Sequence, residues 1–245
     1  MKYFLILIIF GISCQSPKKE LTAQEIVDKA MEKAGTEKVS NAQISFDFRD
    51  KSYQAIRNNV AFQLIRTFDS VKDVLSNNGF QRFVNENPIT LSDSSATIYS
   101  NAVNSVHYFS VLPFGLNDKA VRKKILPSAT LKGKEYYKIE ITFSENGGGD
   151  DYEDVFVYWF DKEHFTMDYL AYSFHTNGGG KRFRAVKNVQ IVEGIHFVNF
   201  DNYAPKSDTI FLTDLDKAYE NNSLTLVSEI VLENLKVIVL SEFGK

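Results

Sequence analysis

The chain has 245 residues, of which 44% are hydrophobic, and it contains 20 Phe and 12 Tyr. This is enough apolar material to bury a sizeable single core. The formal net charge of −3 excludes an electrostatic partnership with nucleic acid, which needs a strongly basic surface. The single cysteine, Cys14, excludes an internal disulfide and any site built from several cysteines.

The first residues predict the export signal of a lipoprotein. Lys2 precedes an uncharged run over residues 3–12, which is far shorter than the roughly 20 apolar residues that span a bilayer. The phrase Gly11-Ile12-Ser13-Cys14 resembles a bacterial lipobox, with Gly11 where that motif has Leu. We therefore expect residues 1–13 to be a signal peptide, Cys14 to be the lipid attachment site and residues 14–20 to be a polar tether.

An amphipathic helix and an antiparallel meander are predicted next. Thr22 and Glu25 have the spacing of a capping box, and the apolar stripe that starts at Ile26 ends at Gly35. Apolar and polar residues then alternate over 42–48, which predicts a strand with one buried face. Further strands are expected at 53–57, 60–68, 71–75 and 80–84, and their hairpin-sized connections indicate antiparallel pairing.

Midway along the chain the pattern becomes helical. Val103, Val106, Phe109 and Leu112 recur at helical spacing within residues 101–112. A second, short helix is expected at 119–125, capped by Asn117 or Asp118. Strands return at 136–144, 182–192 and 195–202, and a final strand run covers 224–240.

A long hairpin is predicted between two glycine tracts, 146–149 and 177–180. Its two strands, 154–161 and 168–174, are rich in aromatic and β-branched residues. Both strands are apolar on both faces, whereas a sheet with one wet face alternates apolar with polar residues. Helices, the curvature of the sheet or a ligand in a concavity must therefore cover both faces.

Polar residues at the glycine tracts offer candidate chemistry. The tract 146–151 invites a calcium interpretation, but repeated calcium-binding loops need many copies and this occurs once. No Gly-x-Ser-x-Gly elbow supplies a nucleophile. We predict no catalytic residue, no metal and no cofactor, and whether the protein is an enzyme stays uncertain. The candidate polar rim consists of Asp150, Asp154, His175, Arg182 and Arg184.

Two of these residues, Arg182 and Arg184, point to the same face of their predicted strand. They would either pair with Asp150, Asp154 or Asp168 of the neighbouring strands or meet an acidic group of a ligand. Internal pairing is the favoured interpretation, because a buried guanidinium needs a counter-ion.

Several phrases resemble a family of Bacteroidota lipoproteins of unknown function. Among them are Asn104-Ser105-Val106-His107-Tyr108-Phe109, Leu112-Pro113-Phe114, Tyr158-Trp159 and Arg182-Phe183-Arg184. The resemblance covers about residues 22–240, and it implies relatives without implying an activity.

The order of elements is similar to the outer-membrane lipoprotein carrier and receptor fold, which is LolA/LolB-like. In that fold a strongly curved half-barrel holds acyl chains in an apolar concavity that helices close. The resemblance implies an α+β fold for residues 21–245: a single half-barrel domain made of a curved antiparallel meander, an N-terminal amphipathic helix and inserted helices over the concave face.

Our first hypothesis is a membrane-anchored, non-enzymatic lipoprotein of the cell envelope, at the outer membrane. It would bind a lipid or another apolar ligand in the concavity, and an envelope protein would be a further partner. Which strand face looks inward stays open. One alternative is an accessory interaction subunit of an envelope complex, and another is a hydrolase or lyase at the acidic rim. The candidate ligand-lining residues are Phe156, Tyr158, Trp159, Tyr169, Tyr172, Val106 and Phe109.

Overall fold

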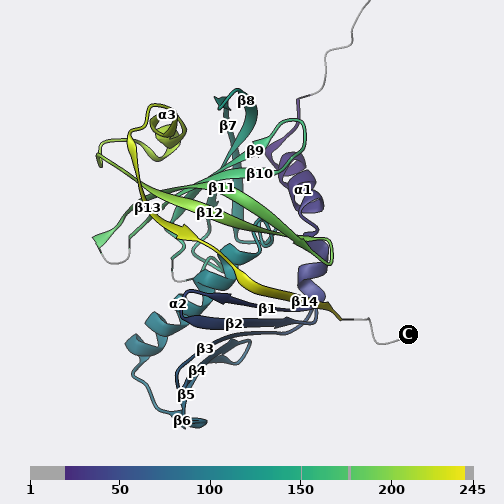
Figure 1. Cartoon of the computed structure of the whole chain (residues 1–245), viewed down its shortest axis with the longest axis vertical. Coiled ribbons are helices and arrows are strands. Elements are labelled where there is room, and N and C mark those ends of the chain that lie inside the picture. Colours follow the sequence, from purple (N-terminus) through teal and green to yellow (C-terminus); the bar gives the residue numbers. More distant parts are fainter. Residues whose placement is uncertain (1–19, 150, 176–177, 241–245) are drawn as a thin grey trace, which may run out of the picture.

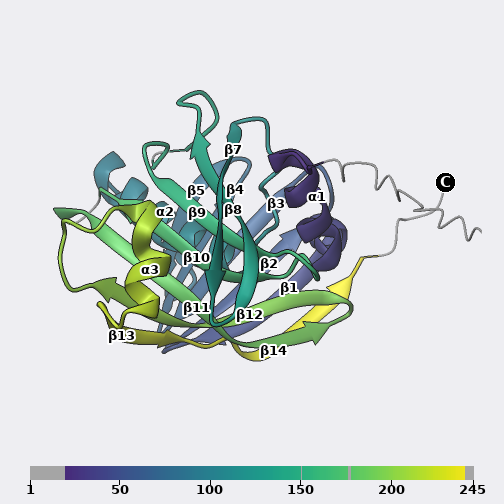
Figure 2. The same ribbon diagram turned by 90° about the horizontal axis from the view of Figure 1, so that it is seen from above.

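A computed structural model describes residues 20–149, 151–175 and 178–240. The described strands form two antiparallel seven-stranded sheets, both curved and neither closed into a barrel (Figures 1 and 2). This confirms the expected α+β half-barrel class, with the refinement that the strands divide between two sheets. The expected signal segment 1–13 and Cys14 lie outside the described residues.

The N-terminal sheet combines the expected meander with a strand from the far end of the chain. Its strand order is β14-β1-β2-β3-β4-β5-β6, and β14 pairs with β1 so that Val239 lies opposite Ala42. The strands are β1 (Ala42–Phe48), β2 (Lys51–Arg57), β3 (Phe62–Phe68), β4 (Val71–Ser76), β5 (Gly79–Val84), β6 (Asn87–Ile89) and β14 (Glu233–Val239).

The central sheet contains the predicted hairpin, in which Tyr172 lies opposite Phe156. Its order is β13-β12-β11-β10-β9-β8-β7. The expected helix at 119–125 is wrong, because this segment belongs to an edge strand in which Val121 pairs with Phe143. The strands are β7 (Val121–Leu131), β8 (Lys134–Phe143), β9 (Val155–Asp161), β10 (Met167–Phe174), β11 (Gly180–Val192), β12 (Ile195–Pro205) and β13 (Leu224–Ile230).

Helix α1 (Ala23–Lys33) starts with the predicted capping box. The hydroxyl of Thr22 accepts from the backbone N–H of Glu25, whose carboxylate accepts from the backbone N–H of Thr22. After α1, Gly35 adopts a φ of +67° before the 3-10 helix η1 (Thr36–Asn41). A Cβ at Gly35 would collide with the carbonyl oxygen of Gly194 in the β11–β12 turn, so glycine is required here.

Helix α2 (Asp93–Ser110) joins the two sheets and begins well before the expected start at residue 101. In its middle, the buried Val103 packs with Ala55 and Leu64 of the N-terminal sheet. At its C-terminal end, the ring of Phe109 lies 6.0 Å from that of Phe156 in the central sheet. The helix therefore covers the concave side between the sheets (Figure 1).

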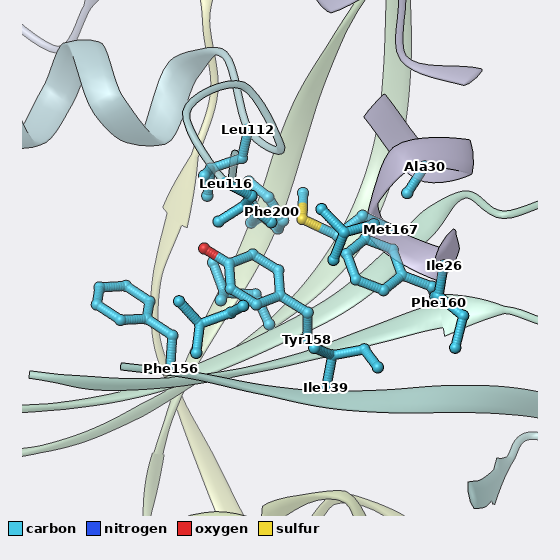
Figure 3. Packing of buried hydrophobic residues seen from close by; sticks show 13 residues of the cluster. Ile26, Ala30, Leu112, Leu116, Ile139, Phe156, Tyr158, Phe160, Met167 and Phe200 are labelled. Atoms are coloured by element: carbon cyan, nitrogen blue, oxygen red, sulfur yellow. The ribbon is translucent and has the colours of Figure 1, made fainter. Parts of the chain in front are cut away.

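Both faces of the central sheet are buried, as the apolar pattern of the hairpin predicts. On the inner face, Tyr158 and Phe160 pack with Ile26 of α1 and with Leu112 and Leu116 from the segment after α2 (Figure 3). On the outer face, the 3-10 helix η3 (Leu212–Asp214) and helix α3 (Leu215–Glu220) cover a second cluster. Within the described ranges, no helix is long and apolar enough to cross a bilayer.

Candidate functional site

A cavity of about 360 Å³ lies between the C-terminal half of α2 and the inner face of the central sheet. Its volume falls within the roughly 300–1,000 Å³ of small-molecule sites. Most of its walls are apolar. The lining residues are Phe48, Ser105, Val106, Phe109, Ser110, Asp151, Asp154, Tyr172, Phe174, Arg182, Arg184, Val198, Phe200, Ile230 and Leu232.

Helix α2 forms the roof of this cavity, which we call the α2 cavity. Val106 and Phe109 line it, and the ring of Phe109 lies 5.2 Å from that of Tyr172 on β10. The polar edge of the roof is fixed internally, since the hydroxyl of Ser110 donates to the carbonyl oxygen of His107 at 2.9 Å. The roof thus presents apolar side chains to the sheet.

Strand alternation decides which residues of the central sheet reach the cavity. Tyr172 lies opposite Arg182 in the β10–β11 register, so both side chains project to the inner face. Phe183, between Arg182 and Arg184, projects to the outer face and packs in the cluster under α3. The same face of β11 therefore supplies both arginines to the cavity.

Arg184 is a buried cation without a carboxylate partner among the described residues. Its side chain is 7% exposed, and its guanidinium lies 3.9 Å from the ring centre of Phe109. One nitrogen, Nη2, donates to the hydroxyl of Tyr172 at 2.9 Å, whereas Nε has no hydrogen-bond partner in the described structure. Burial lowers the pKa of Arg184, and the positive charge of Arg182 adds to this effect.

Arg182 lies closer to the mouth and is only partly buried. Its Nη1 donates to the carbonyl oxygen of Lys181 at 2.8 Å, and its guanidinium lies 5.1 Å from the ring centre of Phe174. No ion pair joins Arg182 or Arg184 to an acid among the described residues.

The favoured internal pairing is therefore not formed with two of the three expected acids. Asp154 pairs with His175, whose Nδ1 lies 3.4 Å from Oδ1. Asp168 lies near Lys134, at 3.7 Å, and accepts a hydrogen bond from Tyr136. Asp150 lies outside the described residues.

The acidic rim forms the mouth of the α2 cavity, where Asp151 and Asp154 line it. Asp151 is exposed and Asp154 partly buried. Burial raises the pKa of Asp154, while the hydrogen bond from His175 lowers it. Within the parts of the chain that the structure describes, no three His, Cys, Asp or Glu side chains gather closely enough to hold a metal ion.

The seven predicted lining residues divide among three places. Val106, Phe109 and Tyr172 line the α2 cavity. Phe156 and Tyr158 lie on the same inner face but pack beneath α2, where the Tyr158 hydroxyl is 3.4 Å from that of Tyr108.

The other two predicted lining residues, Trp159 and Tyr169, lie on the outer face in the cluster under α3. There the indole nitrogen of Trp159 donates to Oδ2 of Asp216 at 3.1 Å. The same carboxylate oxygen accepts a hydrogen bond from Lys138 at 2.7 Å. The structure therefore assigns the single tryptophan to a buried polar network and not to the cavity.

Several cavity residues come from strands that sequence reasoning did not connect with the hairpin. Phe48 ends β1, Ile230 ends β13, and Leu232 follows β13. The apolar alternation of β1 marked one buried face without indicating what it packs against. On β12, Val198 and Phe200 alternate with polar residues, which is the signal that could have placed them on the inner face.

A curved antiparallel sheet with helices over its concave face and an apolar cavity beneath them defines a LolA-like half-barrel. Two solved structures share this fold. A DUF1329 family protein from Desulfovibrio piger matches with a TM-score of 0.53 and 12% identity, over 91% of this chain and 94% of that chain. A LolA superfamily protein from Nitrosomonas europaea matches with a TM-score of 0.51 and 14% identity, over 92% and 96%.

Residues 1–233 match the family of unknown function DUF6503, and the chain belongs to that family. No curated protein matches the chain. The expected membership in a family of unknown function is thus confirmed. The LolA-like resemblance is confirmed at the level of the fold.

Proposed function

We propose that this protein is a membrane-anchored, non-enzymatic binding module that holds the apolar chain of a lipid in the α2 cavity. The observation that carries the proposal is the cavity itself, which is lined by Phe109, Val198 and Phe200 between a covering helix and the concave face of the sheet. Because its volume of about 360 Å³ is at the lower end of the range for ligand sites, it suits one chain better than several.

The location follows from the sequence. A lipid on Cys14 would hold the protein at a membrane of the cell envelope without a spanning helix, and we assign it to the outer membrane. Residues 14–20 would connect that anchor directly to α1. The domain 21–245 would then present the α2 cavity close to the bilayer that contains its ligand.

The rim also carries residue types that a hydrolase or lyase would use. Asp154 contacts His175 at 3.4 Å, and Arg182 lines the same cavity. However, His175 is hydrogen-bonded to Asp154 and to no hydroxyl nucleophile among the described residues. Binding without chemistry is therefore the function that this geometry supports best.

A test is to fill the cavity from its roof. In the Cys14→Ser protein, purified without detergent, the Val106→Trp variant is compared with Ile98→Trp on the same helix, where Ile98 is 65% exposed. We expect the neutral apolar dye N-phenyl-1-naphthylamine to bind the parent and Ile98→Trp, and to bind Val106→Trp at least about tenfold more weakly.

Native mass spectrometry of the same proteins gives a second measurement. We expect a lipid mass on the parent that organic extraction removes, and a reduced amount on Val106→Trp. Equal dye binding by all three proteins, together with a mass free of lipid, would overturn the proposed function and favour a partner-docking role.

A further inference from the structure

The buried guanidinium of Arg184 is a feature of the α2 cavity that an apolar chain alone does not explain. A cation buried to 93% without a counter-ion destabilises the fold, because desolvation opposes its charge. Arginine cannot escape this cost by losing its proton, because a guanidinium stays protonated in proteins. A bound anion would supply the missing counter-ion.

Two hydrogen-bond donors of residues that line the α2 cavity have no acceptor among the described residues. Arg184 and Tyr172 both line it. The Nε of Arg184 has no partner, and the Tyr172 hydroxyl accepts from Nη2 of Arg184, which leaves its own O–H to donate. These two donors suit one acidic group, because carboxylates and phosphates accept two hydrogen bonds side by side.

The same edge of a guanidinium already binds a carboxylate elsewhere in this protein. Arg66 donates from Nε at 3.0 Å and from Nη2 at 2.6 Å to Asp73. In Arg184 the corresponding edge has Nη2 on the Tyr172 hydroxyl and Nε free. The two sites thus differ mainly in whether the protein provides the acid.

Both cations and acids line the α2 cavity. Arg182, two residues along β11, places a second cation on the same face. The acids Asp151 and Asp154 lie at the mouth, and Asp154 is engaged by His175 at 3.4 Å. Beside Arg184, the walls are the aromatic rings of Phe109 and Phe200, at 3.9 and 5.8 Å from the guanidinium.

We propose that the ligand of the α2 cavity is an anionic single-chain amphiphile whose acidic group pairs with Arg184 and the Tyr172 hydroxyl. This inference rests on the proposed function and adds the chemical class of the ligand. A fatty-acid carboxylate and the phosphate of a single-chain phospholipid share the required chemistry. The apolar chain lies against Phe109, Val198 and Phe200.

The experiment compares head groups on one chain length. Dodecanoate, dodecyl phosphate and 1-dodecanol each compete with N-phenyl-1-naphthylamine for the Cys14→Ser protein at neutral pH. We expect at least one of the two anions to bind at least about tenfold more tightly than the alcohol, as a charge-assisted hydrogen bond predicts. The anion that binds more tightly identifies the carboxylate or the phosphate as the natural group.

Three variants test which side chains cause the preference for an anion over the alcohol. Arg184→Met removes the charge and keeps the length of the side chain, and we expect it to bind the anions and the alcohol equally. Tyr172→Phe removes only the hydroxyl and should reduce the preference a few-fold. Arg122→Met removes an exposed cation from β7 and should leave the preference unchanged. Tyr172→Phe also covers the case in which Arg184→Met fails to fold.

The outcomes separate this inference from the proposed function. If the alcohol and both anions bind the parent equally and Val106→Trp weakens all three, the binding function stands and the anion site is overturned. If Arg184→Met keeps the parent's preference for an anion, Arg184 is not its partner. If no amphiphile displaces the dye, the proposed function and the anion site both fail.

Discussion

Helix α2 covers two buried arginine sites that differ in one respect, the presence of a carboxylate. Under its N-terminal half, Asp73 is fully buried and bonds both Arg66 and Arg82, each at 2.6 Å. The guanidinium of Arg82 also lies 3.4 Å from the ring centre of Tyr99 on the helix. Under its C-terminal half, Arg184 contacts the ring of Phe109 in a similar way but pairs with no acid in the part of the chain that the structure describes.

The difference separates a structural charge cluster from a candidate binding site. Where the protein supplies the counter-ion, α2 packs closely on β3, β4 and β5, and the cluster is satisfied. Where the protein does not supply the counter-ion, at Arg184, a cavity lies beside the guanidinium. A buried cation, an unfilled donor and an open apolar space at one place indicate a ligand, whereas a buried cation alone does not.

The largest effect on stability is expected from removing the counter-ion of Arg66 and Arg82. Asp73→Asn leaves Arg66 and Arg82 buried without a counter-ion, and we expect the free energy of unfolding to fall by about 3–5 kcal/mol. Urea denaturation followed by circular dichroism measures this change. Asp69→Asn, at an exposed turn position, is the control and should shift stability by less than about 0.5 kcal/mol. A similar small shift for Asp73→Asn would contradict the comparison.

Another buried basic group, His107, loses its charge instead of pairing it. It lies on α2 against the stacked rings of Phe46 and Tyr53, at 5.9 and 5.6 Å, with Nε2 3.0 Å from the carbonyl oxygen of Ile65. Burial lowers its pKa from 6.5 to about 4. As the pH falls through this window, the unfolded chain takes up a proton that the folded chain refuses, so stability decreases.

The measurement for His107 is the free energy of unfolding from pH 8 to pH 4. Above about pH 6.5 this group contributes no pH dependence, and between 6.5 and 4 it should cost about 3 kcal/mol, at roughly 1.4 kcal/mol per pKa unit. His107→Gln should remove that part of the slope. A variant whose slope equals that of the parent would show that His107 is protonated in the folded protein.

Removing the unpaired cation should have the opposite sign to removing Asp73. In lipid-free protein, Arg184→Met replaces an uncompensated buried charge with an apolar side chain, so we expect the free energy of unfolding to rise by about 1 kcal/mol or more. At one fixed concentration, dodecanoate should stabilise the parent more than the variant, because the variant binds it more weakly. Thermal unfolding with and without dodecanoate measures both effects, and a destabilised lipid-free variant would contradict the view that Arg184 is an uncompensated charge.

The smallest effect, on ligand affinity, is expected from a substitution at the mouth of the α2 cavity. Asp154→Asn removes a negative charge that opposes an anionic ligand, but this carboxylate is partly exposed and engaged by His175. Such charges contribute up to about 1 kcal/mol, so affinity for dodecanoate should rise by less than about fivefold. Calorimetric titration measures the change. A loss of affinity would mean that Asp154 holds the ligand instead of repelling it.

The local pattern of apolar and polar residues was sufficient to predict much of the fold. The hairpin of β9 and β10 was predictable because two long aromatic runs are bounded by glycine tracts. The helix expected at 119–125 failed because the edge strand β7 is largely exposed and lysine-rich there, so its apolar residues do not mark one buried face. The sequence pattern did not predict the first turns of α2 for a similar reason. Ile98 is 65% exposed, so it does not extend the apolar stripe of the helix toward its N-terminus.

The candidate site depended on information that local pattern does not contain. Alternation shows that Trp159 and Tyr158 face opposite ways, but it does not show which face is concave. The sequence pattern predicted a single final strand run over residues 224–240. The structure instead divides it between β13 in the central sheet and β14 in the N-terminal sheet. Long-range packing also brings Phe48 to the cavity and leaves Arg184 without an acid.

The pairing of β14 with β1 has a consequence for how the protein is made. Val239 lies opposite Ala42, so β1 can pair with β14 only after the whole central sheet has been synthesised. Contacts so distant in sequence form slowly, and an unpaired strand edge invites association with other chains. The nascent protein would therefore expose the free edge of β1 until β14 has been synthesised, and a chaperone that shields this edge would matter most during that interval.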